Sequence, residues 1–422
     1  MPTISQTDSW KSYTTKISSA LEITAYILCF TTMIVALFDN NLSMKLYTGI
    51  TILCVLALSM RGKPTLYSLR YWILPLSILT LGVVDVIWYS TFKMDNSPFR
   101  GTYHSYLNAA KIFIFGAFIT FMALTTRIRL KKEFPLYILY SLSFIIAGIA
   151  YYIKSTTGID RLNFGIGTAT GAAYSIILVG IVSAISILYT KRNHPFLFLL
   201  NALAVLYALG LTQTRSALLI FPILCTLALI ACYIKSPKKL FFSVIGFFTL
   251  LALIIIAFSK PIYNRYHEGV KDLTKYSTGN SDSSLGARLA MYEVGAIIFA
   301  NAPLSARSAD ERYRKMRSLA NERPYLRTAL RFSKVHLHNE FIEAASLKGI
   351  AGIFSTLFFY TALLFTVYYH RSLGLFMITL AVIGTGLSDV ILWSRSIPIV
   401  LMTAMVILIF IKRKRVIEDQ PQ

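Results

Sequence analysis

Charged side chains are scarce in this sequence. Only 14% of its 422 residues are Asp, Glu, Lys or Arg, whereas soluble domains contain about 25%. Hydrophobic residues make up 55% of the chain, and its mean hydropathy is +0.61. This composition excludes a soluble globular protein and indicates a chain that crosses a membrane many times.

Cysteine is also rare, and the sequence lacks the common motifs of nucleotide and metal sites. There is no Walker A loop, no Gly-x-Gly-x-x-Gly, no His-Glu-x-x-His and no Asp-x-Asp pair. A transfer reaction would therefore need a donor that is already activated. The cysteines all fall inside apolar runs, and we expect small buried residues instead of disulfides or metal ligands at Cys29, Cys54, Cys225 and Cys232.

About twelve apolar runs have the length and composition of helices that cross the bilayer core. The expected fold is an all-α polytopic membrane protein, whose first span is retained as an anchor because no cleavable signal sequence precedes it. The runs cover 21–38, 46–60, 72–90, 107–125, 136–153, 173–190, 196–212, 217–234, 240–260, 351–370, 373–393 and 397–411.

Basic residues in the short connections predict the orientation of these spans. They fall on alternate sides of successive spans, so parity places all of them, with both termini, in the cytoplasm. Topology signals and contact with anionic lipids suffice to explain them. The clusters are Arg61/Lys63/Arg70, Arg127/Arg129/Lys131/Lys132, Lys191/Arg192, Lys235/Lys238/Lys239, Arg371 and Lys412/Arg413/Lys414/Arg415.

One polar segment, 261–350, interrupts the apolar pattern and is expected to face the other side. It holds 14 of the 42 Lys and Arg and nine of the 19 acids. We therefore expect nine spans in 1–260, a large helical outward loop in 261–350, and three spans with a basic tail in 351–422. The basic residues of the loop, in a chain of net charge +23, point to an anionic ligand such as phosphate. Nucleic acid is not expected on that side.

Two helices are predicted inside the loop. Ser308 and Glu311 form a capping box for a charged helix that should end before Pro324. Another helix should cover 285–299, where apolar residues repeat at helical spacing. Arg288 lies on the flank of its apolar stripe, where the side chain either extends over packed neighbours or reaches an anion in a pocket.

A third helix is predicted from His338 to Lys348. Gly349 would follow His338 by about three turns, on the same face, and would allow close approach of a neighbouring helix or a lipid substrate. His338 is then a titratable group where the loop meets the membrane, suited to taking a proton from a hydroxyl. The alternative is a hydrogen-bonded or capping histidine without a chemical role.

Two more arginines lie in very short outward hairpins, where basic residues are least expected. Arg215 follows Thr-Gln-Thr, and Arg395 lies between two serines. With Arg288 they suggest a basic ring at the outer mouth of the bundle, able to bind phosphate oxygens bidentately. Asp389, near the outer end of a span, is expected to pair with one of these arginines, and direct contact with substrate is the alternative.

Two weaker patterns lie beside His338. His336 and His338 make a poor metal motif, because on a helix their rings would diverge, and no metal is expected. Glu340 and Glu343 share a helix face in the manner of a glycosidase pair. Glutamates that are solvated or paired with Lys348 are the more common explanation.

At these residues the sequence resembles the O-antigen ligases of Gram-negative bacteria, in particular the enterobacterial type. His338-Asn339, nine residues and then Gly349 match the family's His-[Asn/Ser/Gln]-x9-[Gly/Thr/Asn] pattern at the end of the large outward loop. Arg215 in Thr-Gln-Thr-Arg and Arg288 in Leu-Gly-Ala-Arg match its two other key arginines. The resemblance extends over essentially the whole chain.

The resemblance implies an inverting, GT-C-like membrane glycosyltransferase that needs neither metal nor ATP and no other cofactor. Its donor would be O-polysaccharide on undecaprenyl diphosphate, and its acceptor a sugar hydroxyl of lipid A-core at the periplasmic face of the bacterial inner membrane. His338 would be the general base, Asn339 would position it or the sugar, and Arg215 and Arg288 would bind the diphosphate. The first outward loop, 39–45, lacks the acidic pair of many GT-C enzymes, in agreement with a metal-free reaction.

Two other activities are compatible with such a chain. An O-antigen polymerase would use the same donor with a growing lipid-linked chain as acceptor. A flippase or transporter of lipid-linked oligosaccharides would need charges along an inner cavity, whereas the intramembrane charges here are few and lie near the outer ends of the spans.

Overall fold

Regular structure in the described part of the chain is entirely helical. A computed structural model describes residues 6–61, 68–126, 128, 134–190, 195–257 and 259–418. Of the basic residues used to predict orientation, Lys63, Arg127, Arg129, Lys131, Lys132, Lys191 and Arg192 lie outside these ranges. The elements are α1 (Gln6–Val35), α2 (Asn40–Met60), α3 (Leu69–Phe92), α4 (Arg100–Thr125), α5 (Phe134–Thr157), α6 (Ala169–Leu188), α7 (Pro195–Thr212), α8 (Arg215–Tyr233), α9 (Pro237–Ala257), α10 (Ser259–Ser277), α11 (Ser284–Ala300), α12 (Ala309–Glu322), the 3-10 helix η1 (Pro324–Phe332), α13 (Glu340–His370), α14 (Leu373–Gly386) and α15 (Ser396–Glu418).

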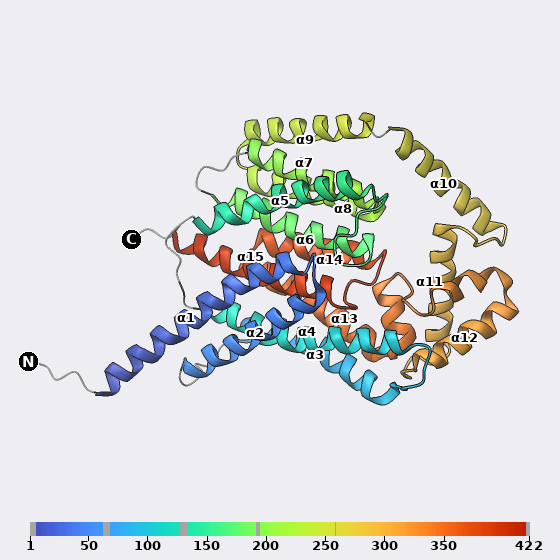
Figure 1. The fold of residues 1–422 in the computed structure, drawn as a ribbon, viewed down its shortest axis with the longest axis horizontal. Helices are drawn as coiled ribbons and strands as arrows, with labels where there is room; N and C mark the ends of the chain where they lie inside the picture. Colours follow the sequence, from blue (N-terminus) through green and yellow to red (C-terminus); the bar gives the residue numbers. More distant parts are fainter. Residues whose placement is uncertain are drawn as a thin grey trace, which may run out of the picture.

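Long apolar helices form a bundle, and the polar helices α10 to α12 gather at one end of it (Figure 1). Among the described residues, nine helices have the length and composition of membrane spans, namely α1 to α8 and α13. The helices α14 and α15 are apolar but shorter, and α9 covers the ninth predicted run. Each predicted run thus overlaps a helix in a multi-pass membrane protein, while the number of crossings stays a prediction.

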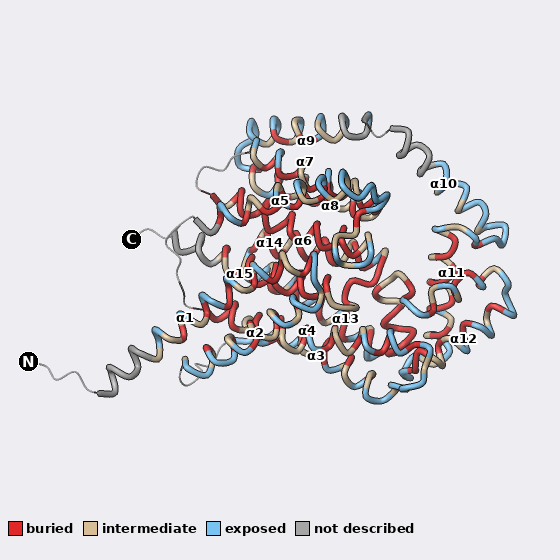
Figure 2. Tube along the Cα trace, in the orientation of Figure 1, coloured by how far each residue is buried: buried red, intermediate tan, exposed pale blue. Residues whose placement is uncertain are grey.

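The middle of the bundle is built around α6, which is buried along its length (Figure 2). A helix that is apolar on every side has no face suited to solvent and is stable only when other helices surround it. The last helix, α15, packs against α1, α4 and α6. The core therefore depends on both ends of the chain.

The polar end contains the helices predicted for the outward loop. Helices α11 and α12 lie within a few residues of their predicted bounds. The Ser308 hydroxyl accepts the backbone N–H of Glu311 at 3.0 Å, which confirms Ser308 as the N-cap of α12. A small core of its own, including Met291, Val294 and Met316, holds α11, α12 and η1 together.

The predicted span 373–393 is wrong at its outer end. Helix α14 ends at Gly386, and 387–395 is non-helical. The physical reason lies in Glu340, whose carboxylate accepts the backbone N–H groups of Ile391 and Leu392 at 2.8 and 3.0 Å. These amides are satisfied without a helix, so apolar residues here form a buried loop.

The prediction that a helix begins at His338 is also wrong. His338 has a left-handed backbone with φ of 51°, and α13 begins at Glu340 with Asn339 as its N-cap. The helix is interrupted at Gly349, where φ is 59° and ψ is −146°. A Cβ at Gly349 would lie 2.7 Å from the carbonyl oxygen of Pro303, so only glycine fits this contact. His338 and Gly349 therefore do not share a helix face.

Candidate functional site

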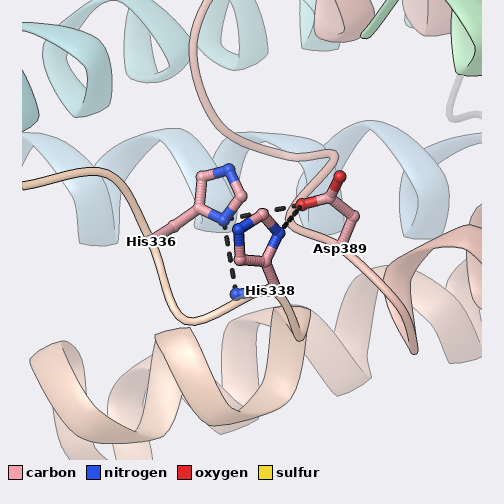
Figure 3. Close-up of side chains that lie close together, drawn as sticks. All are labelled: His336, His338 and Asp389. Carbon is pink, nitrogen blue, oxygen red and sulfur yellow. Dashed lines mark hydrogen bonds and ion pairs between the residues drawn. The ribbon is translucent and has the colours of Figure 1, made fainter. Parts of the chain in front are cut away.

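His338 and Asp389 form the centre of the candidate site. Nδ1 of His338 lies 2.9 Å from Oδ1 of Asp389, and both side chains are largely buried. Figure 3 shows their side chains, with that of His336, pointing toward one another from two segments of the chain. Since Asp389 accepts a hydrogen bond, the proton of neutral His338 belongs on Nδ1, and Nε2 keeps the lone pair.

The backbone around His338 is held by polar contacts to the loop that carries Asp389. The Tyr292 hydroxyl of α11 donates to the carbonyl oxygen of His338 at 2.8 Å and to that of Leu387 at 3.3 Å. The side-chain amide of Asn339 donates to the same Leu387 carbonyl at 3.0 Å, while its oxygen caps α13. These contacts stabilise the left-handed backbone of His338, which costs about 1–3 kcal/mol in a non-glycine residue.

Glu340 also attaches the loop that carries Asp389 to the start of α13. Its buried carboxylate binds the amides of Ile391 and Leu392, two and three residues after Asp389. The expectation of a solvated or Lys348-paired Glu340 is wrong, because backbone N–H groups take the place of water and lysine. The loop is thus attached to the first residues of α13 both before and after Asp389.

His336 is the functional candidate that sequence reasoning missed, except as half of a weak metal motif. Its ring centroid lies 4.5 Å from that of His338 and 5.0 Å from that of Trp393. Its Nδ1 lies 3.5 Å from Oδ1 of Asp389 and accepts the backbone N–H of His338. Burial lowers the pKa of His336 to about 4, against the attraction of Asp389, so its imidazole is neutral near pH 7.

Asp389 is ionised beside these two imidazoles. Burial alone would raise the pKa of its carboxyl, but the hydrogen bond with His338 and the neighbouring His336 hold that pKa below its usual value. In the described part of the chain Asp389 is hydrogen-bonded to His338 and the Val390 amide, with the neutral ring of His336 beside it. The predicted salt bridge from Asp389 to an arginine is wrong.

The same three side chains could hold a metal ion. One ligand atom from each of His336, His338 and Asp389 lies within 4.8 Å of the others. The argument that the two rings must diverge does not apply, because 333–339 is not helical. A metal-free site stays a prediction, supported by the hydrogen bond that already satisfies His338 and Asp389.

Arg288 lies near this centre without an acidic partner. Its side chain is partly buried on α11, and none of the carboxylates in the described part of the chain lies within ion-pair distance of it. Arg288 and Asp389 both interact electrostatically with the buried Tyr174 hydroxyl of α6. A partly buried guanidinium without a carboxylate can bind an anionic ligand.

Arg215 approaches the same region from α8. The hydroxyl of its neighbour Ser216 lies 3.0 Å from that of Tyr174, so Tyr174 connects the start of α8 with Arg288 and Asp389. The Arg215 guanidinium is half-exposed and lies 3.3 Å from a carboxylate oxygen of Glu268 in α10. Such an exposed pair is worth at most about 1 kcal/mol and is readily exchanged for another anion.

Two predicted site residues are not linked to this centre. Arg395 donates to the side-chain oxygen of Asn41 at 2.9 Å, and within the described ranges it makes no hydrogen bond or ion pair with His338 or Asp389. Gly349 lies against the carbonyl groups of Pro303 and Ser305. Arg395 in a basic ring and Gly349 at a substrate surface remain predictions.

Buried ion pairs attach the polar end to the bundle beneath the site. Glu343 accepts from Arg312 at 2.7 Å, from the Tyr106 hydroxyl at 2.9 Å and from the Leu337 amide at 2.8 Å. This connects α12, α4 and the His336–His338 segment, so the expectation of a solvated Glu343 is wrong. A second pair, Lys348 with Asp85 at 2.7 Å, joins α13 to α3. Sequence patterns gave no sign of either partner.

Comparison with known proteins places this geometry in context. A family model described as O-antigen ligase matches residues 200–357, which include Arg215, Arg288 and His338. A protein of Escherichia coli (strain K12) named O-antigen ligase is 58% identical over 406 residues, covering 96% of this chain and 97% of its own. An uncharacterized protein of Haemophilus influenzae is 24% identical over 245 residues, 56% of this chain and 60% of its own.

Proposed function

The chain belongs to the O-antigen ligase family, and we propose that it transfers O-polysaccharide from undecaprenyl diphosphate to a sugar hydroxyl of lipid A-core. The transfer takes place at the periplasmic face of the bacterial inner membrane, with both termini in the cytoplasm. The fold is GT-C-like, and the reaction inverts the anomeric centre without metal or ATP. The observation that carries the proposal is the contact of His338 with Asp389.

His338 is the general base of the proposed reaction. Its Nε2 takes the proton of the acceptor hydroxyl while that oxygen forms a bond to the anomeric carbon of the donor. Asp389 keeps the opposite proton on Nδ1 and stabilises the imidazolium that results. A positioned base of this kind contributes about 100- to 10,000-fold to the rate.

The leaving group is the lipid diphosphate, which departs with the electrons of the broken glycosidic bond. Arg288 is available to bind it, because no carboxylate in the described part of the chain pairs with it. Arg215 can contribute once its exposed contact with Glu268 is exchanged for phosphate. Fixed positive groups that face developing negative charge each lower the barrier by several kcal/mol, a factor of about 100 to 1,000.

The direct test is ligation by the purified full-length protein in lipid nanodiscs. Lipid-linked donor and purified lipid A-core are supplied, and the transferred glycan is measured on gels and by mass spectrometry. Ligation by the wild-type protein and its loss in His338→Ala are expected. His104→Ala serves as the control, because His104 lies beside Tyr89 and Arg100, outside the candidate site.

The same assay separates the proposal from its alternative. An O-antigen polymerase would extend the lipid-linked donor and leave lipid A-core unmodified. Full activity of His338→Ala would instead reject the general-base role while leaving the ligase assignment in place.

A further inference from the structure

A cavity lies at the end of the bundle opposite to His338. Its volume is about 420 Å³. Residues at the ends of α6 and α8, at the connection between α13 and α14, and near the end of α15 line it. Helix α13 begins beside His338, and its uninterrupted part after Gly349, residues 350–370, is 21 residues long, which corresponds to about 30 Å. The cavity is therefore separated from the candidate active site by the thickness of the membrane and needs a ligand of its own.

Two cations from different helices line this cavity. Arg371 follows α13 and Lys412 belongs to α15, and none of the residues lining the cavity is acidic. Arg371 makes no hydrogen bond or ion pair with the residues that the structure describes, and it is exposed. Helix α14 begins beside it with Ser372 as N-cap, so the positive end of that helix adds to the field of the two cations.

The backbone conformation of Arg371 indicates that this arginine has a role besides ending helix α13. Its φ of 46° and ψ of 45° are left-handed, a conformation for which glycine is the usual residue after a helix. A left-handed non-glycine residue is strained, and such residues are retained where the side chain has a use. Here Arg371 lines the cavity with a guanidinium that pairs with no carboxylate in the described ranges.

The remaining walls are apolar. Leu188, Val367, Leu373 and Phe376 line the cavity next to Ala231, which is exposed at its edge. A free phosphate ion would leave this apolar surface uncovered. A phosphate attached to an acyl chain would cover both the cations and the apolar walls. Basic pockets between transmembrane helices at the cytoplasmic side are suited to anionic lipid head groups.

We propose that this cavity binds an anionic phospholipid, with Arg371 and Lys412 on the phosphate and the start of an acyl chain against Phe376 and Val367. In the orientation of the proposed function the lipid belongs to the cytoplasmic leaflet, although binding itself does not depend on ligase activity. The site is selective for net negative charge, because both cations would contact the head group.

Lipid binding by the full-length protein in detergent micelles tests this proposal. Native mass spectrometry measures how much phosphatidylglycerol or phosphatidylcholine is retained, and inorganic phosphate is added as a competitor. Phosphatidylglycerol should bind at least about tenfold more tightly than phosphatidylcholine, and the double variant Arg371→Gln/Lys412→Gln should lose this preference. Inorganic phosphate should compete weakly.

Two control variants distinguish lipid binding in the cavity from general attraction of anionic lipid to the positive charge of that surface. Lys235→Gln/Lys238→Gln removes two charges, one from the α8–α9 connection and one from the first turn of α9, outside the cavity, and should retain wild-type binding. Ala231→Phe fills the edge of the cavity without changing charge and should weaken binding. The proposal would be overturned if both lipids bound equally or if both double variants lost binding equally. It would also be overturned if phosphate displaced the lipid at the lipid's own concentration.

Discussion

Nδ1 of His338 contacts a carboxylate oxygen of Asp389 at 2.9 Å although 51 residues separate the two in the sequence. One residue precedes α13 and the other follows α14. The proton-accepting group of the proposed reaction is therefore oriented by a loop near the end of the chain, and changes in that loop should affect catalysis without touching substrate.

Asp389→Asn should lower kcat about 100-fold or more while the protein remains folded. The amide leaves no negative charge to stabilise the His338 imidazolium, and its NH2 group favours the wrong tautomer. The measurement is kcat against pH in the nanodisc assay. Asp95→Asn removes a carboxylate that is exposed and pairs with Lys93, so its kcat should match the wild type, and an equal loss there would contradict the prediction.

Arg288→Ala should lower kcat about 100- to 1,000-fold, because the departing diphosphate loses a fixed positive charge. Arg288→Lys should recover part of the rate, since charge is restored without the planar fork. Arg331→Ala is the matched control from the same polar region, where the arginine pairs with Asp282 and both are exposed. A Lys variant no better than the Ala variant would argue for a packing role.

Glu340→Gln should lower kcat with little change in KM, since Glu340 touches the Asp389 loop and the proposed role does not involve substrate. Ile391 and Leu392 donate to one oxygen of Glu340, which the amide oxygen of Gln can replace, but a neutral acceptor makes each hydrogen bond weaker by about 1 kcal/mol. Steady-state kinetics and thermal unfolding would be measured together. Glu322→Gln, at the exposed end of α12, should change neither quantity. If KM of Glu340→Gln rose by as large a factor as kcat fell, this would indicate that Glu340 contacts the substrate instead.

Acid should destabilise the protein through His336. Its pKa is about 4 in the folded state and about 6.5 when unfolded, so the unfolded chain binds the proton more readily between these values. Stability is then lost as the pH falls from about 6.5 towards 4, by up to about 3 kcal/mol. His336→Gln should reduce this dependence in thermal unfolding between pH 7.5 and 5, whereas His104→Gln should leave it unchanged.

Activity should survive a chelator. His336, His338 and Asp389 could bind a metal, but the proposed base requires His338 to hold a proton on Nδ1, where a metal would take its place. Ligation is therefore expected to continue at the wild-type rate after treatment with EDTA and dialysis. A strict requirement for an added divalent ion would contradict the metal-free mechanism.

The helices could be predicted from the sequence because hydrophobic runs and caps are local. Ser308 caps α12 as expected, and each apolar run overlaps a helix, although the run 373–393 extends beyond the end of α14. The local structure at His338 could not be predicted in the same way, since Asn339 competes as N-cap and the left-handed turn depends on Tyr292 and Leu387. The helix–loop choice at 387–395 likewise depends on Glu340, from a segment about 50 residues earlier.

The candidate site was predictable in part for the same reason. Arg215 stands out in a short hairpin, Arg288 on the flank of an apolar helix stripe, and His338 where the polar loop meets the membrane, and a single sequence shows all three positions. The partner of Asp389 is set by packing between distant segments, and an arginine was the natural expectation for an acid near the membrane surface. His336 carried no signal beyond its spacing, because its importance comes from burial against Trp393 and Asp389.

The attachment of the Asp389 loop to the first residues of α13 has a consequence for the synthesis of the protein. His338 emerges from the ribosome well before Asp389, Ile391 and Leu392, and until these residues arrive its ring has no carboxylate and Glu340 has no amides to bind. A chain that stops after α13 would carry every arginine of the site and still lack an oriented base. In the proposed mechanism, full activity therefore requires that the final helices are inserted.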